Sequence, residues 1–189
     1  MNTYVILMRG INVGGKNKIP MAALKLCLEE QGCKNVVTYI QSGNAVLQSD
    51  LDARTLSRKI EAVLPKKFKL DSSIIRVLVL EHAMFKKAVA QAPKEFGTDN
   101  GRYRYYVLFI MDTSPREAMK DIDVRPGVDA AWQGAAAIYY RLPSLTSPDA
   151  TKSYLNKVTQ KPIYKLITMR NWATTTKLLT LLDGVSPKN

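Results

Sequence analysis

The sequence predicts an α/β protein of the α+β type, with two ferredoxin-like split βαβ lobes in which mostly antiparallel sheets carry helices on one face. Two observations predict this class. The first 80 residues alternate short apolar runs and helical periodicity in the order β-α-β-β-α-β, and the second half partly repeats that order. We expect an N-terminal ferredoxin-like lobe over residues 1–80 and a C-terminal α/β lobe with basic terminal helices over residues 81–189.

The elements of the first lobe are bounded by residues that start or stop regular structure. Gly10 closes the first strand, Pro20 suits the first turn of a helix, and Gly32 suits a left-handed stop after it. Asp50 or Asp52 is expected to cap the second helix. The expected spans are a strand at 3–8, a helix at 20–31, strands at 36–40 and 45–48, a helix that Pro65 ends, and a strand at 73–80.

The second half shows equally local signals. Ser114-Pro115-Arg116-Glu117 is a capping box with proline at the first helical position. The segment 132–135 suits a tight hairpin turn, and Thr168 suits the N-cap of the last helix. The expected spans are a helix at 83–90, a loop at 93–101, a strand at 104–111, a helix to about 122, strands at 128–132 and 136–141, and helices at 148–158 and 171–182.

Composition points to a globular protein of the cytoplasm. The chain has 189 residues, of which 46% are hydrophobic and 23% charged, which is ordinary globular usage. The apolar run 4–8 lacks a basic lead and is shorter than a signal-peptide core, and no run is long enough to span a bilayer. We therefore expect a cytoplasmic location and no membrane partner.

Metal and cofactor chemistry is not indicated. The two cysteines, Cys27 and Cys33, argue for no disulfide framework, and Cys27 is expected to be a buried thiol of the first helix. The single histidine, His82, opens a predicted helix, where a solvated or capping role is expected. We expect no metal site and no cofactor, and composition leaves the oligomeric state open.

Positive charge gathers near the C-terminus. The chain carries 28 basic and 16 acidic side chains, a formal charge of +12, and residues 150–182 contain no carboxylate. Tyr154, Tyr164 and Trp172 are interleaved with the basic residues there, as in a groove that tracks phosphates and stacks bases. The alternative is that the aromatic residues belong to the core and the charge serves solubility.

A glycine loop with two lysines follows the first strand. Residues 10–16 fit the spacing G-x-x-x-x-G-K, but Asn17 stands where a P-loop needs the serine or threonine that holds Mg²⁺. The helix is also predicted to begin too far after Lys16. A looser anion site and an ordinary βα turn with solvated lysines both remain open.

Three motifs resemble a known family. They are Arg9-Gly10-Ile11-Asn12-Val13-Gly14-Gly15-Lys16-Asn17, then Thr38-Tyr39-Ile40-Gln41-Ser42-Gly43-Asn44, and finally Thr168-Met169-Arg170-Asn171-Trp172 with Thr176-Lys177-Leu178. Together they resemble a mainly bacterial family catalogued as domain of unknown function 1697. That resemblance implies two ferredoxin-like lobes and no agreed activity.

The resemblance also implies which residues form a ligand-binding site. These are Arg9, Asn12, Gly14, Gly15 and Lys16 in the first loop, Gln41, Ser42 and Asn44 in the second, and Arg170, Asn171 and Trp172 near the end. Such families usually carry a Ser-Lys pair before the penultimate helix, where this chain has Thr151-Lys152 preceded by Pro148. Thr151 and Lys152 therefore keep the hydroxyl group and the ammonium group of the family's Ser-Lys pair.

No catalytic constellation is recognisable, because paired carboxylates and a nucleophile beside a histidine base are both missing from these motifs. The first hypothesis is a binding module for nucleic acid or a phosphate-bearing ligand. The second is an enzyme that acts on a phosphorylated small molecule between the lobes, with Ser42 or Lys16 as the reactive group. The third is a protein-interaction domain.

Three geometric expectations complete the sequence analysis. Asn12 or Lys16 should lie in side-chain contact with the turn at 42–44. Arg170, in the first turn of the last helix, should point toward the glycine loop, because a cation there opposes the helix dipole unless an anion compensates it. Trp172 should be a packing anchor.

Overall fold

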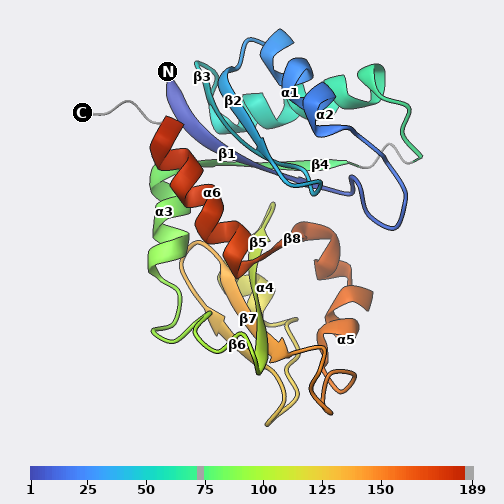
Figure 1. Ribbon diagram of the computed structural model, residues 1–189, viewed down its shortest axis with the longest axis vertical. Coiled ribbons are helices and arrows are strands. Elements are labelled where there is room, and N and C mark those ends of the chain that lie inside the picture. Colours follow the sequence, from blue (N-terminus) through green and yellow to red (C-terminus); the bar gives the residue numbers. More distant parts are fainter. Residues whose placement is uncertain (72–74, 186–189) are drawn as a thin grey trace. The chain divides into compact units, whose positions relative to one another are not determined.

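The computed structural model describes residues 1–71 and 75–185, and the chain divides into two compact units (Figure 1). Unit 1 comprises Met1–Phe85 with Lys177–Asn189, and unit 2 comprises Lys86–Thr176. Each unit contains one four-stranded sheet. The mixed α/β class and the two ferredoxin-like sheets expected from the sequence are confirmed.

Unit 1 has the strand order β2-β3-β1-β4, and all neighbouring strands are antiparallel. This is the split βαβ arrangement, in which the first strand lies between the third and the fourth. Helices α1 and α2 cover one face of the sheet (Figure 1). The elements are β1 Asn2–Arg9, α1 Met21–Glu30, β2 Lys34–Tyr39, β3 Asn44–Ser49, α2 Ala53–Lys67 and β4 Arg76–Glu81.

The helix boundaries of unit 1 follow largely from local chemistry. The Asp52 carboxylate accepts a hydrogen bond from the Thr55 N–H at 2.9 Å, so Asp52 is the N-cap of α2. Gly32 has φ +88° just after α1, as expected for a left-handed stop. The expectation that Pro65 ends α2 was wrong, because the helix continues to Lys67. The expected start of the last strand at residue 73 lies outside the described residues.

The core of unit 1 lies between its sheet and the two helices. It is formed by alternate residues of β1 together with the apolar sides of α1 and α2: Tyr4, Ile6, Met8, Leu24, Leu28, Leu56, Ile60 and Leu64. The end of helix α6 (Trp172–Val185) approaches the opposite face, where Gln48 Nε2 donates to the Val185 carbonyl at 3.1 Å.

Unit 2 repeats the topology of unit 1. Its strand order is β6-β7-β5-β8, again antiparallel throughout. Helix α3 leads into this unit. The elements are α3 His82–Ala90, β5 Tyr103–Ile110, α4 Pro115–Met119, β6 Ala130–Gln133, β7 Ile138–Pro143, α5 Leu155–Gln160, a 3₁₀ helix Pro162–Leu166 and β8 Ile167–Asn171.

The last strand corrects the expected C-terminal order. Thr168 and Arg170 belong to β8, and α6 begins only at Trp172, so neither residue lies in a helix. The strand forms because β5 offers it a partner edge, on which Arg170 stands opposite Val107. The element order of unit 2 is therefore a complete β-α-β-β-α-β.

Three smaller expectations for unit 2 were also wrong. Ser114 caps α4 through the Glu117 N–H at 3.1 Å, but that helix ends at Met119 and not near residue 122. The hairpin turn lies later than 132–135, because the Gly134 N–H donates to the Ala137 carbonyl at 2.8 Å. Residues 148–154 contain turns and no helix, so α5 is limited to Leu155–Gln160.

The two faces of the second sheet differ in chemistry. One face packs against α4 and α5 through Leu108, Ile138 and Leu142. The other face carries aromatic and cationic side chains, because residues of neighbouring strands alternate between the faces in register. This second face holds the candidate site.

Candidate functional site

The glycine loop of unit 1 is a small hairpin. The Lys16 N–H donates to the Val13 carbonyl at 3.0 Å, and Gly14 and Gly15 have φ +58° and +78°. Two consecutive residues with positive φ make a type I′ turn, for which glycine is well suited. Both glycines and Lys16 are exposed. The loop is thus a protruding hairpin rather than the opening of a P-loop helix.

Two asparagines fasten this hairpin to the backbone. Asn12 Oδ1 accepts from the Ile19 N–H at 2.8 Å, and Asn12 Nδ2 donates to the Ile19 carbonyl at 3.0 Å. Asn17 Nδ2 donates to the Gly10 carbonyl at 2.6 Å, and its N–H donates to Asp71 Oδ2 at 2.7 Å. Asn12 therefore shapes the loop through backbone contacts.

The second motif packs directly against the first. A Cβ on Gly43 would lie 2.8 Å from Ile11 Cδ1, and the Met8 N–H donates to the Gly43 carbonyl at 2.8 Å. The two N-terminal loops are therefore neighbours, as the sequence suggested. The contact runs through Ile11, whereas the expected side-chain contact of Asn12 or Lys16 with the turn at 42–44 stays a prediction.

The remaining motif residues of unit 1 have different surroundings. Asn44 is fully buried, and its Nδ2 donates to the Tyr39 carbonyl at 3.2 Å and to Ser42 Oγ at 2.8 Å. Gln41 is exposed, and Arg9 is half-buried at the end of β1, opposite Arg76. Asn44 is thus a turn-forming residue, while Gln41 and Lys16 face solvent.

Acidic side chains from outside the carboxylate-free segment neutralise part of its charge. Lys152 pairs with Asp149 at 2.7 Å, and Lys161 pairs with Asp123 at 2.9 Å. Lys157 Nζ lies 3.5 Å from the centroid of the Tyr154 ring, in a cation–π contact. Fewer lysines are consequently available to a polyanion than the sequence suggests.

The last motif is buried in β8. Arg170 is 8% exposed, and its Nη1 donates to Thr168 Oγ1 and to the Met169 carbonyl, both at 2.8 Å. Burial lowers the pKa of Arg170 to about 10, which leaves the side chain cationic at neutral pH. Asn171 Oδ1 accepts from the Ala173 N–H at 2.8 Å at the start of α6.

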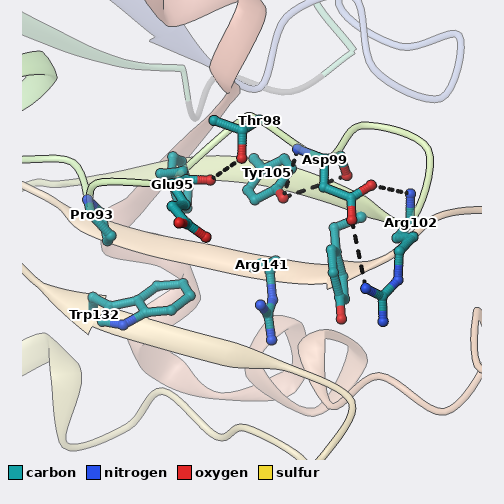
Figure 2. Close-up of a pocket in the computed structure, with 10 residues that line it drawn as sticks. Pro93, Glu95, Thr98, Asp99, Arg102, Tyr105, Trp132 and Arg141 are labelled. Atoms are coloured by element: carbon teal, nitrogen blue, oxygen red, sulfur yellow. Dashed lines mark hydrogen bonds and ion pairs between the residues drawn. The ribbon is translucent and has the colours of Figure 1, made fainter.

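Unit 2 contains a pocket of about 310 Å³ on the aromatic face of its sheet (Figure 2). Its walls come from the loop 93–102 and from strands β5, β6 and β7. The lining side chains are Pro93, Glu95, Phe96, Thr98, Asp99, Arg102, Tyr103, Tyr105, Trp132 and Arg141. The size lies at the lower end for small-molecule sites.

Arg141 is the charged residue that extends from the sheet into this pocket. Its guanidinium carbon lies 4.1 Å from the centroid of the Tyr103 ring and 5.7 Å from that of Trp132. Nε of Arg141 is buried and has no hydrogen-bond partner among the described residues. Burial of a donor without a partner costs free energy.

The loop above Arg141 is held by its own hydrogen bonds. Asp99 Oδ1 accepts from the Arg102 N–H at 3.1 Å, and Asp99 Oδ2 lies 3.8 Å from Arg102 Nη1 (Figure 2). Thr98 Oγ1 donates to the Glu95 carbonyl oxygen at 2.9 Å. The rim of the pocket is therefore largely formed in advance of any ligand.

Phe96 anchors the same loop to the sheet. It is 6% exposed and makes edge-to-face contacts with Tyr105, Trp132, Tyr139 and Trp172 at centroid distances of 5.0, 6.1, 5.5 and 5.3 Å. Trp172 is half-buried and belongs to this cluster, which agrees with its expected packing role.

Sequence reasoning missed this pocket because only the register of the strands assembles it. Arg141 stands opposite Tyr105 in β5 and opposite Ala130 in β6, so Tyr103 and Trp132 are its diagonal neighbours. Tyr103 and Tyr105, two positions apart in one strand, are the local signal that could have pointed to this face.

Within residues 1–71 and 75–185, no group of three or more His, Cys, Asp or Glu side chains is arranged to hold a metal ion. Over the same residues, no helix is both long enough and apolar enough to cross a bilayer.

The fold defines an α/β protein made of two split βαβ units, each with a helix-covered sheet. Residues 1–139 match the family described as "Protein of unknown function (DUF1697)", and the chain belongs to that family.

A solved structure, that of the conserved bacterial protein SP0830 from Streptococcus pneumoniae, is similar over nearly the whole chain. The two share 26% identity with a TM-score of 0.77, over 96% of this chain and 98% of that chain. An unknown protein from Galdieria sulphuraria aligns over 97% of this chain and 91% of that chain, with 8% identity and a TM-score of 0.24. No curated protein matches the sequence.

Proposed function

We propose that this protein is a binding module for a small ligand that carries an anionic group and a flat ring, held in the pocket of unit 2. The observation that carries the proposal is the guanidinium of Arg141, which lies in the pocket with a buried Nε and no hydrogen-bond partner among the described residues. A carboxylate or phosphate oxygen of a ligand would pair with this guanidinium in a charge-assisted hydrogen bond.

The aromatic walls support a ring on the ligand. Trp132 is 37% exposed and lines the pocket together with Phe96 and Tyr105. Rings in such a setting gain from burial and from stacked or edge-on contacts. The pocket is also small, which favours a metabolite-sized ligand over a polymer.

Two simple probes test the proposal: benzoate and phenyl phosphate, each a ring with one anionic group. Titration by NMR should show saturable shifts of the lining residues. Arg141→Gln should weaken binding by about tenfold or more, because the charged contact is lost. The matched control is Arg116→Gln, an exposed position in α4 where binding should stay the same. Equal binding of the probes by Arg141→Gln and the wild type would reject the pocket as the site of the anionic group.

A second candidate function is binding of nucleic acid at the glycine hairpin. Lys16 and Lys18 are exposed beside its tip, and in the described part of the chain neither forms an ion pair. Counterion release makes such binding salt-dependent, and each lost phosphate contact lowers the log–log slope by about 0.7 to 0.9.

The test compares single-stranded and double-stranded oligonucleotides over a range of salt concentrations. The double variant Lys16→Gln/Lys18→Gln should flatten the slope, whereas Lys152→Gln should change it little because Asp149 already neutralises Lys152. A slope that is identical for the double variant and the wild type would assign the charge to solubility.

A further inference from the structure

The pocket of unit 2 holds charges of both signs. Four charged side chains line it: Glu95, Asp99, Arg102 and Arg141. Asp99 and Arg102 are joined to each other through the backbone hydrogen bond and the side-chain contact described above. Glu95 and Arg141 remain, and neither side chain has an ion pair or hydrogen-bond partner among residues 1–71 and 75–185. The pocket therefore presents one carboxylate and one guanidinium to a ligand.

The two charges occupy different positions in the pocket. Arg141 rises from the sheet between aromatic rings and is half-buried, whereas Glu95 belongs to the exposed loop above it (Figure 2). Glu95 is held in place because the Phe96 N–H donates to the Pro93 carbonyl at 2.8 Å and Thr98 Oγ1 donates to the Glu95 carbonyl. The anionic end of a ligand therefore belongs at the sheet, and a cationic end belongs at the loop.

A purely anionic ligand fits this arrangement less well than a zwitterion, because its charge would face the Glu95 carboxylate as well as Arg141. Like charges in a partly desolvated site disfavour binding. A ligand that also carries an ammonium group offers a partner of opposite charge to each side chain.

We propose that the pocket binds a free α-amino acid with an aromatic side chain, whose carboxylate contacts Arg141 and whose ammonium group contacts Glu95. This inference rests on the proposed function and names the class of ligand for the same site. The aromatic side chain packs among Phe96, Tyr105 and Trp132. The small volume admits one such molecule.

The experiment compares three molecules that differ by one charged group: L-phenylalanine, 3-phenylpropionate, which lacks the ammonium group, and phenethylamine, which lacks the carboxylate. Binding is measured by calorimetry or NMR titration at about pH 7, where the carboxylate and ammonium groups of these molecules are ionised. The wild type should bind L-phenylalanine about tenfold or more tightly than either analogue, because each analogue leaves one pocket charge unpaired.

Variants assign each charge to its residue. Glu95→Gln should remove the preference for L-phenylalanine over 3-phenylpropionate, while Arg141→Gln should weaken binding of both and remove the preference for L-phenylalanine over phenethylamine. Arg141→Lys keeps the positive charge and should restore part of the affinity. It replaces Arg141→Gln in the comparison if Arg141→Gln unfolds at a much lower temperature than the wild type. Glu29→Gln, at an exposed position in α1 of unit 1, is the matched control for Glu95→Gln.

The outcomes separate the two proposals. Equal binding of L-phenylalanine and 3-phenylpropionate by the wild type, unchanged in Glu95→Gln, overturns the amino-acid assignment and leaves the anionic pocket standing. If neither molecule binds, and benzoate and phenyl phosphate also fail to bind, the pocket proposal itself is wrong.

Discussion

Gly97 and Trp172 are in such close contact that Gly97 has no room for a side chain. A Cβ on Gly97 would overlap Cδ1 and Nε1 of the indole ring, and φ at Gly97 is +88°. The loop 93–102 can approach the sheet only because this position is glycine. The contact holds the rim of the pocket against the start of α6.

The variant Gly97→Ala should therefore destabilise the protein by about 2–4 kcal/mol, through backbone strain combined with overpacking. Gly127→Ala is the matched control, because Gly127 has φ +75° but nothing within 4 Å of its Cβ position. The control should cost about 1–2 kcal/mol from strain alone. Urea unfolding measures both, and equal losses would contradict a role for the indole contact.

Replacement of Phe96 should disrupt the same cluster from its centre. Phe96→Ala is expected to cost about 3–5 kcal/mol, because a buried ring and its four edge-to-face contacts are removed. Phe96→Leu keeps most of the apolar burial and should cost clearly less. Thermal and urea unfolding provide the measurement. Similar losses for the two variants would show that the ring contacts contribute little.

Arg170→Gln should lower stability. The side chain is buried in β8, and its loss removes the hydrogen bonds to Thr168 and to the Met169 carbonyl. We expect a loss of about 1–3 kcal/mol in urea unfolding. Arg58→Gln, at an exposed position in α2, is the control and should be neutral. A role of Arg170 in ligand binding stays a prediction, and a neutral Arg170→Gln would favour that role over a structural one.

The buried hydroxyl group of Tyr139 should make the folded protein less stable at alkaline pH. Burial raises the pKa of Tyr139 from 10.0 to about 12, and its hydroxyl donates to the Ala88 carbonyl at 2.6 Å. Because the folded-state pKa is higher, the stabilising contribution is complete below pH 10 and is lost as the pH rises through about 12.

The test compares the wild type with Tyr139→Phe between about pH 9 and about pH 12. The difference in unfolding free energy should shrink toward high pH by up to about 2 kcal/mol, since phenylalanine does not titrate. The comparison cancels the opposite contribution of Arg170, whose lowered pKa favours the folded state as the pH rises above about 10. A difference that stays constant over this range would contradict the burial of a protonated Tyr139.

Local chemistry determined most of the elements. The caps at Asp52 and Ser114 and the stop at Gly32 could be read from the sequence, because each depends on residues within one or two turns. The repeated β-α-β-β-α-β order followed from apolar periodicity. The family was recognised from three short motifs and matches residues 1–139.

The roles of the motif residues were harder to predict from the sequence. Polar residues beside glycines suggested a ligand site, yet Asn12 and Asn44 hydrogen-bond to the backbone of their own loops. A sequence shows which donors a loop carries but not which acceptors fold back onto them.

Strand β8 and the pocket were decided only by the tertiary structure. Thr168 and Arg170 were predicted to lie at the start of a helix, because their strand forms only through pairing with β5. Their polar side chains are buried on the aromatic face of the sheet. Arg141 meets Tyr103 and Trp132 because the register of three strands, distant in sequence, aligns them. Periodicity and capping act over a few residues, whereas pairing and register join residues far apart in the chain, so the physical interactions that built this pocket have no local signature.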